Sequence, residues 1–266
     1  MRPLAEFPKP ARRAVRYVLA DIDDTLTVDG RLTGDAYGAM ERIRARGLKM
    51  VPITGRPAGW CDLIARQWPV DGVVGENGAF YFAYDDDSRT MTRRFWKDAA
   101  ARASDRERLD RLCGQILAVV PGAAVSADQP YREADLAIDY CEDIERLSDD
   151  AVARIVALFE EAGAHAKISS IHVNGWFGDY DKLAMTRILF REVFKADLDA
   201  VRKTVVFAGD SPNDAPMFDY FPHAVGVANV ADFAGRLDAE PAWITGSPGG
   251  HGFTELAEAI LEARGA

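Results

Sequence analysis

The sequence has few cysteines and no long apolar run. The three cysteines, Cys61, Cys113 and Cys141, are widely spaced, which excludes a disulfide framework and a cysteine metal site and favours reduced thiols. The longest largely apolar stretch, Ile116–Val125, is interrupted by a Pro-Gly pair and is much shorter than the roughly 20 residues that a membrane span needs. Prolines and charges near the N-terminus do not predict a signal peptide. We therefore expect a cytoplasmic protein with no membrane partner.

Positive charge is also scarce. The 32 Lys and Arg residues are outnumbered by 42 Asp and Glu residues, which gives a formal net charge of -10. This balance argues against a nucleic-acid partner, although it leaves room for a local basic pocket that binds phosphate. With 266 residues, 48% of them hydrophobic, the chain is long enough for one large domain or for a core with a second module.

Strand and helix patterns alternate towards both ends of the chain. The expected strands are Val15–Ala20, Lys49–Ile53, Asp71–Val74, Lys203–Ala208, Ala224–Val227 and Ala242–Thr245. The expected helices are Gly34–Arg46, with Thr33 as its N-cap, Ala58–Gln67, Asp181–Lys195, Asn213–Tyr220 and Thr254–Ala263. This alternation predicts an α/β fold with a parallel sheet and right-handed crossovers.

The middle of the chain has a different pattern. The segments Phe80–Tyr84 and Thr90–Trp96 predict a hairpin. Expected helices follow at 101–120 and 148–163, with expected strands at 123–126, 134–141 and, as a pair, between 165 and 174. We expect residues 81–179 to form an inserted α+β domain, and residues 1–80 and 180–266 to form the core.

Acidic side chains follow two of the expected core strands. Asp21 and Asp23 come after the first strand, and a later strand is followed by Asp210, Asn213 and Asp214. Because open α/β sheets bind ligands at the carboxyl ends of their strands, these residues should meet in one crevice. The repulsion among four acids is tolerable only if a cation lies between them. The sequence therefore predicts an enzyme with a Mg²⁺ site.

The spacing of Asp21 and Asp23 suits phosphoryl transfer. One carboxylate can attack phosphorus and form an aspartyl phosphate, and the other can protonate the departing alkoxide and then activate water. An EF-hand loop also begins Asp-x-Asp, but it needs Gly at its sixth position and Glu at its twelfth, where this sequence has Leu26 and Leu32. The alternative that the two acids only cap a helix or a turn stays open.

Two further segments are candidates for holding a phosphoryl group. In the turn Thr54-Gly55-Arg56, the threonine offers a hydroxyl and a backbone N–H, and the glycine permits close backbone approach. Lys182 opens an expected helix, where a lysine is unfavourable to the helix dipole, so a role in neutralising the transferred group is worth considering. Its spacing alone fits an ordinary exposed lysine equally well.

Taken in order, these motifs resemble those of a known superfamily. Asp-x-Asp-x-Thr beginning at Asp21, the turn at Thr54, an isolated Lys182 and Gly-Asp-x-x-Asn-Asp ending at Asp214 look like the four motifs of the haloacid dehalogenase (HAD) superfamily of phosphohydrolases. The second acid, Asp23, is similar to that of the phosphatase and phosphomutase members.

The position of the insert in the chain also resembles that in one subfamily of this superfamily. The segment between Thr54 and Lys182 has room for a large cap after the third strand, introduced by Gly75–Ala79, as in subfamily IIB, which includes sugar-phosphate phosphatases. Asp24 stands where many relatives have Gly, which puts only the local turn in question.

The resemblance implies a role for each motif residue. The implied catalytic residues are Asp21 as the nucleophile, Asp23 as the general acid/base, and Thr54 and Lys182, which would hold the phosphoryl group. The implied metal ligands are Asp21, the backbone carbonyl of Asp23 and Asp210. Asp214 and Asn213 would either complete the metal site or lie just behind its ligands. Gly55 and Arg56 join Thr54 and Lys182 as candidate substrate-binding residues.

The insert is expected to select the substrate. Strand alternation puts His172, Asn174 and Trp176 on one face. It turns Ile171 and Val173 towards the insert's own core. A Trp beside hydrogen-bonding side chains suits a sugar ring, but a Trp anchored at the junction with the core is at least as good an interpretation.

Two other residues have two interpretations each. Asn77 is a candidate substrate contact, although its residue type also suits a turn in the left-handed conformation. His251 lies in a glycine-rich segment that either borders the pocket or forms a surface loop.

The sequence thus predicts a Mg²⁺-dependent phosphatase that acts on a small phosphorylated metabolite, preferably a sugar phosphate, through an aspartyl phosphate. A phosphomutase would use the same nucleophile and return the phosphoryl group to the sugar. A binding protein on a retired enzyme scaffold is the remaining alternative. We expect a monomer or a homodimer.

Overall fold

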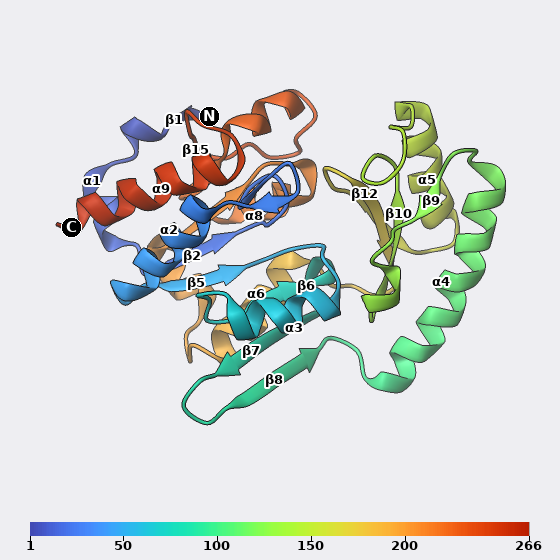
Figure 1. The fold of residues 1–266 in the computed structure, drawn as a ribbon, viewed down its shortest axis with the longest axis horizontal. Coiled ribbons are helices and arrows are strands. Elements are labelled where there is room, and N and C mark those ends of the chain that lie inside the picture. The colour runs from blue at the N-terminus through green and yellow to red at the C-terminus, as the bar shows by residue number, and fades with distance from the viewer. Residues whose placement is uncertain (266) are drawn as a thin grey trace.

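The computed structural model of the chain, which describes residues 1–265, is built on a six-stranded parallel sheet (Figure 1). Its strand order is β1-β15-β14-β13-β2-β5, and every neighbouring pair is parallel. The strands are β1 (Arg2–Pro3), β2 (Tyr17–Ala20), β5 (Lys49–Pro52), β13 (Val205–Gly209), β14 (Ala224–Gly226) and β15 (Trp243–Ile244). The expected α/β class is confirmed.

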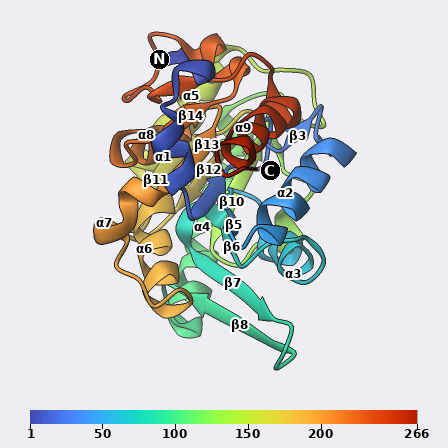
Figure 2. The same cartoon turned by 90° about the vertical axis from the view of Figure 1, so that its left-hand side faces the viewer.

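Helices cover both faces of this sheet (Figure 2). One face is covered by α2 (Gly34–Ala45), α3 (Ala58–Gln67) and α9 (Gly249–Ala263), with α1 (Lys9–Ala14) against α9. The other face is covered by α6 (Lys182–Glu192), α7 (Leu198–Val201) and α8 (Ala215–Tyr220). The two apolar cores are centred on residues such as Met40 and Leu256 on the first face, and Leu189 and Phe218 on the second. Burying each such side chain contributes roughly 1.5–3 kcal/mol, so the sheet is held from both sides.

A three-stranded antiparallel sheet extends the core. It contains β6 (Val73–Gly75), β7 (Phe80–Asp85) and β8 (Thr90–Phe95), and a parallel bridge between Ile53 and Val74 joins it to the end of β5. A small hairpin, β3 (Thr27–Val28) with β4 (Arg31–Leu32), follows the first acid pair.

The hairpin β7–β8, whose residues we expect mostly in the insert, has its buried side chains in the apolar clusters of the core. Phe80 and Phe82 belong to the apolar cluster under α2, α3 and α9, whereas Tyr81 and Ala83 belong to the cluster under α6. Strand alternation buries both faces of β7 in the core. The packing of the insert itself therefore begins with α4. The division of the chain into two domains stays a prediction.

The insert is a four-stranded antiparallel sheet with two helices on its outer face (Figure 1). The elements are α4 (Ala99–Val119), β9 (Ala124–Val125), β10 (Asp135–Asp139), α5 (Asp149–Glu161), β11 (His165–Ile168) and β12 (His172–Trp176). The helices cover a cluster that includes Leu109, Phe159 and Val173. The opposite face of β10 and β12 is turned to the core.

The last helix begins earlier than the sequence pattern predicts. We expect it at Thr254, whereas α9 starts at Gly249. A Cβ on Gly250 would lie 2.7 Å from the carbonyl oxygen of Leu26, so glycine allows the helix to press against the backbone that follows the first acid pair. His251 therefore lies in a helical turn, is exposed and has Nδ1 2.7 Å from Asp35 Oδ2. No helix within residues 1–265 has the length and apolar character to cross a membrane.

Gly78 offers a test of how the core is joined to the helix that carries Lys182. Its φ is +107°, and an added Cβ would lie 2.0 Å from the carbonyl oxygen of Asp181. We expect Gly78→Ala to lower the free energy of unfolding by about 2 kcal/mol or more, through backbone strain and steric overlap. Urea unfolding followed by circular dichroism measures this.

Gly114 provides the control for that measurement. It lies on α4 and is exposed, and a Cβ added to it would have no neighbouring atom within 4 Å. Gly114→Ala should be neutral or stabilise the protein by up to about 1 kcal/mol, because alanine favours helix. Equal unfolding free energies for the two variants would contradict the role given to Gly78.

Candidate active site

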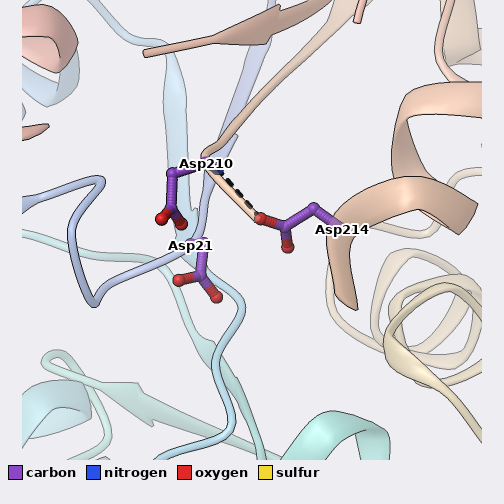
Figure 3. A group of neighbouring side chains, drawn as sticks. All are labelled: Asp21, Asp210 and Asp214. Atoms are coloured by element: carbon purple, nitrogen blue, oxygen red, sulfur yellow. Dashed lines mark hydrogen bonds between the residues drawn. The ribbon is translucent and has the colours of Figure 1, made fainter. Parts of the chain in front are cut away.

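Three buried carboxylates meet at the carboxyl edge of the parallel sheet. Asp21 follows β2 and Asp210 follows β13, and these strands are neighbours in register, with Ala20 opposite Ala208. Asp214 ends the short 3₁₀ turn after β13. One oxygen from each of the three lies within 4.8 Å of the others, and Figure 3 shows the side chains converging. The strand order therefore brings together acids that are far apart in the sequence.

Lys182 lies among these acids. It is the first residue of α6, whose N-cap Asp181 accepts a hydrogen bond from the backbone N–H of Ala184. The Nζ atom of Lys182 lies 2.6 Å from Asp21 Oδ1 and 2.7 Å from Asp214 Oδ1, and the side chain is buried. The alternative of an ordinary exposed lysine is therefore wrong.

The charges of this group are unbalanced without a further cation. Burial raises the pKa of Asp21 to about 8, because the attraction of Lys182 only partly offsets burial and the neighbouring Asp214 and Asp23 oppose ionisation further. Burial and the neighbouring Asp21 and Asp214 raise the pKa of Asp210 well above its usual range. Three ionised carboxylates with one ammonium would leave two negative charges. The all-oxygen donor set and this deficit both fit Mg²⁺.

Asp214 is already engaged on both oxygens. Oδ1 accepts from Lys182, and Oδ2 accepts from the backbone N–H groups of Asp210 and Ser211 at 3.1 and 3.4 Å. This geometry suits a residue that holds Lys182 and the turn in place. Asn213 faces the cavity beside these acids, but its Oδ1 accepts from the Ser211 hydroxyl.

Asp210 has its own supports. Its oxygens accept from the Thr25 hydroxyl and from Asn229 Nδ2, each at 3.3 Å. Asn229 also donates to the carbonyl oxygen of Asp24 and accepts from the N–H of Gly249. Asp24 itself has a φ of +54°, the left-handed conformation that glycine adopts most easily, so the turn is kept with an aspartate in that position.

The side chain of Asp23 is not part of the acidic group. Both of its oxygens accept from Arg56, with Nε at 3.0 Å from each and Nη2 at 2.8 Å from Oδ1. Our expectation that four acids share one cation is therefore corrected: three acids surround Lys182, and the fourth pairs with Arg56. The same guanidinium lies 4.4 Å from the centre of the Trp60 ring and 2.8 Å from Glu142 of the insert.

The Thr54 turn differs from the expectation in one respect. Its backbone N–H donates to the carbonyl oxygen of Val74 at 2.9 Å, so only the hydroxyl is left for a ligand. A Cβ on Gly55 would lie 3.1 Å from Asn77 Nδ2. Asn77 has a φ of +53° and lies outside the residues that line the cavity, which favours its interpretation as a turn residue.

The insert closes over these groups. A cavity of about 10 Å³ lies between the core residues Asp21, Asp23, Gly55 and Arg56 and the insert residues Ser170, His172 and Asn174. That volume holds one water at most. His172 and Asn174 thus reach the acidic edge from the strand face predicted for them.

The predictions for the neighbouring residues of that strand are confirmed for some and wrong for others. Trp176 is buried in the apolar cluster of the core, stacks on Tyr180 and donates to its carbonyl oxygen, so it is the junction anchor rather than a sugar platform. Val173 packs in the insert's own core as expected. Ile171 does not: it precedes β12, is half-buried and lines the cavity.

Several charged residues at this junction belong to none of the sequence motifs. Glu76 accepts from the N–H of Ala58 in the core and from the N–H groups of three insert residues, Glu133, Ala134 and Asp135. Arg132 of the insert donates to the carbonyl oxygen of Gly55 and pairs with Asp128 and Asp135. Asn174 donates to Asp135 as well. Across the junction, Glu76 and Arg132 bind mainly backbone groups, and a residue pattern does not reveal such partners.

Removing the charge of Lys182 tests the acidic group in the metal-free protein. We expect Lys182→Met to lower the free energy of unfolding by about 3 kcal/mol or more, because it leaves buried carboxylates without a partner. Adding Asp21→Asn should restore part of that loss. Urea unfolding with a chelator present measures both. Strictly additive losses would contradict the pairing, and Lys203→Met, at an exposed position, should change stability by less than about 0.5 kcal/mol.

Comparison with known proteins identifies the fold. No protein-family model matches the chain, and no curated protein matches its sequence. The structure is similar to that of the Thermoplasma acidophilum protein 0175, with 16% identity and a TM-score of 0.69 over 93% of this chain and 98% of that one. It is similar to the sucrose-phosphatase of Synechocystis sp. PCC6803 in complex with sucrose and phosphate, with 16% identity and a TM-score of 0.62 over 94% and 96% of the chains. The HAD subclass IIB sugar phosphatase BT4131 shares 13% identity, with a TM-score of 0.60 over 93% and 98%. The chain therefore has the fold of the HAD superfamily, a parallel-sheet core with an inserted cap.

Proposed function

We propose that the protein is a Mg²⁺-dependent phosphatase that hydrolyses a small phosphorylated metabolite through an aspartyl phosphate. The observation that carries this proposal is the buried group of Asp21, Asp210 and Asp214 around Lys182, at the sheet edge where α/β folds bind ligands. The fold shared with solved phosphatases supports the same interpretation.

Asp21 is the proposed nucleophile. Its carboxylate attacks phosphorus, the ester bond breaks, and the alkoxide leaves. Lys182 holds one oxygen of Asp21 and supplies positive charge next to the transferred group. Mg²⁺, held by Asp21 and Asp210 with the carbonyl of Asp23, would neutralise the remaining charge of the acids and of the phosphate. The Thr54 hydroxyl is the proposed donor to a phosphoryl oxygen.

Asp23 is the proposed general acid and base. Both oxygens of Asp23 accept from Arg56, so one of them must leave the guanidinium before the side chain can protonate the leaving group. Arg56 retains Glu142 as a second partner when that happens. The same carboxylate then takes a proton from the water that hydrolyses the aspartyl phosphate.

A sugar phosphate is the proposed substrate class. The insert presents polar side chains to the cavity, His172 and Asn174, with Ser169 and Ser170 beside them. Such groups suit a hydroxylated leaving group. Both the sucrose-phosphatase and BT4131 are named for sugar substrates, which supports this choice for a chain with the same fold.

Phosphate release tests the proposed reaction. With Mg²⁺, the protein should liberate phosphate from members of a panel of sugar phosphates, and Asp21→Asn or Asp23→Asn should reduce the rate at least about a hundredfold. Asp86→Asn, in the exposed turn of the β7–β8 hairpin, is the control and should retain the rate. A hexose 1-phosphate that is isomerised without releasing phosphate would indicate a phosphomutase instead. No reaction across the panel, with Asp21→Asn unchanged, would indicate a binding protein.

Thermal unfolding tests the proposed metal site independently of activity. Saturating Mg²⁺ should raise the midpoint by about 2 °C or more, because it binds the folded chain preferentially and relieves repulsion among the acids. Asp210→Asn should abolish the increase, and Asp86→Asn should preserve it. A midpoint that Mg²⁺ leaves unchanged in the unsubstituted protein would contradict the site.

A further inference from the structure

Glu142 lies at the junction of the insert and the core without belonging to any motif. Its Oε1 accepts from Arg56 Nη2 at 2.8 Å, and its Oε2 lies 2.8 Å from Nε2 of His172. Arg56 belongs to the core and pairs with Asp23, whereas His172 belongs to the insert. Glu142 thus stands next to the proposed acid/base and next to the strand that faces the site.

The backbone around Glu142 is held in place. The N–H groups of Cys141 and Glu142 donate to Asp139 Oδ1 at 2.9 and 2.7 Å, and the N–H of Asp143 donates to Asp139 Oδ2 at 2.9 Å. Asp139 is buried and is paired in register with His172 on the neighbouring strand. The loop therefore carries Glu142 as a fixed part of the insert.

Glu142 keeps its negative charge in this position. Burial opposes its ionisation, but the interactions with His172 and Arg56 outweigh burial and lower the pKa of Glu142 to about 2. The carboxylate is therefore ionised throughout the neutral pH range.

The positive charges that line the cavity are already matched. Arg56 is paired with Asp23 and Glu142. Arg132 is paired with Asp128 and Asp135. Among the described residues that line the cavity, a second anionic group on a ligand would find no uncompensated guanidinium. Glu142 lies directly behind this lining, in contact with Arg56 and His172.

We propose that Glu142 is a specificity-determining residue that excludes phosphate esters whose leaving group carries a second negative charge. This inference rests on the proposed phosphatase function. The cavity of about 10 Å³ has to enlarge to admit an ester, and Glu142 returns with the insert when the site closes. A leaving group that projects from Asp21 towards the insert would then lie beside Arg56 and His172, the two lining residues that the Glu142 carboxylate contacts. A neutral hydroxylated group can donate hydrogen bonds to that carboxylate, whereas a carboxylate or second phosphate is repelled.

The test compares two esters of nearly the same shape. Glycerol 3-phosphate has a neutral leaving group, and 3-phosphoglycerate has a carboxylate in place of one hydroxymethyl group. The inhibition constant of each is measured against hydrolysis of p-nitrophenyl phosphate, for the unsubstituted protein, Glu142→Gln and Glu145→Gln. Glu145 is exposed on the same loop and is the matched control. The ratio of the two inhibition constants within one variant cancels any general loss of folded protein.

We expect the unsubstituted protein to bind glycerol 3-phosphate at least about tenfold more tightly than 3-phosphoglycerate. Glu142→Gln should reduce that ratio by about tenfold or more, because it removes the repulsion and releases Arg56 to attract the carboxylate. Glu145→Gln should leave the ratio within about twofold.

Two other outcomes have separate meanings. Hydrolysis of p-nitrophenyl phosphate with an unchanged ratio in Glu142→Gln would overturn the role of Glu142 and leave the proposed function standing. Failure of the unsubstituted protein to hydrolyse any ester would overturn the proposed function, and the role of Glu142 would fall with it.

Discussion

The pairing of one buried lysine with two buried aspartates is the interaction on which the site depends. Lys182 Nζ lies within 2.7 Å of both Asp21 and Asp214. A buried ion group is tolerated only when each member has its partner, so β2, the turn after β13 and the first turn of α6 have to be placed together. Gly78 lets the core backbone approach the start of α6 closely enough for this. The architecture of the core therefore holds the ammonium group of Lys182 among three carboxylates.

A second ion group ties the insert to the core. Arg56 joins Asp23, a core acid, to Glu142, an insert acid, while Glu76 accepts N–H groups from both parts. These contacts close the site to about 10 Å³. The position of the insert and the partners available to Asp23 are consequently linked, since the guanidinium that neutralises Asp23 is also a contact of the insert. Arg56 would therefore take part both in closing the site and in the proposed catalysis by Asp23.

Much of the fold can be predicted because its signals are local. The strand before Asp21 and the helix Ala58–Gln67 follow from the apolar pattern, and the helix has the predicted bounds. The sequence pattern predicts the hairpin at β7–β8 but not its packing. The alternation of apolar residues indicates which side chains share a face of the strand, but not whether that face packs against the core or the insert. The start of α9 at Gly249 escapes prediction because glycines usually indicate a loop, whereas here they permit close backbone packing.

The chemical groups of the site can be read from the residues alone. Asp21, Asp23, Thr54, Lys182 and Asp210 follow one another along the chain, and the strand–helix alternation carries them to one edge of a sheet. Strand exits and residue types are local properties, so they can be recognised in the sequence alone. Which acid pairs with which cation depends on the folded arrangement of the chain. Ion pairs form between side chains that meet in space, and their strength depends on burial, which is a property of the whole fold.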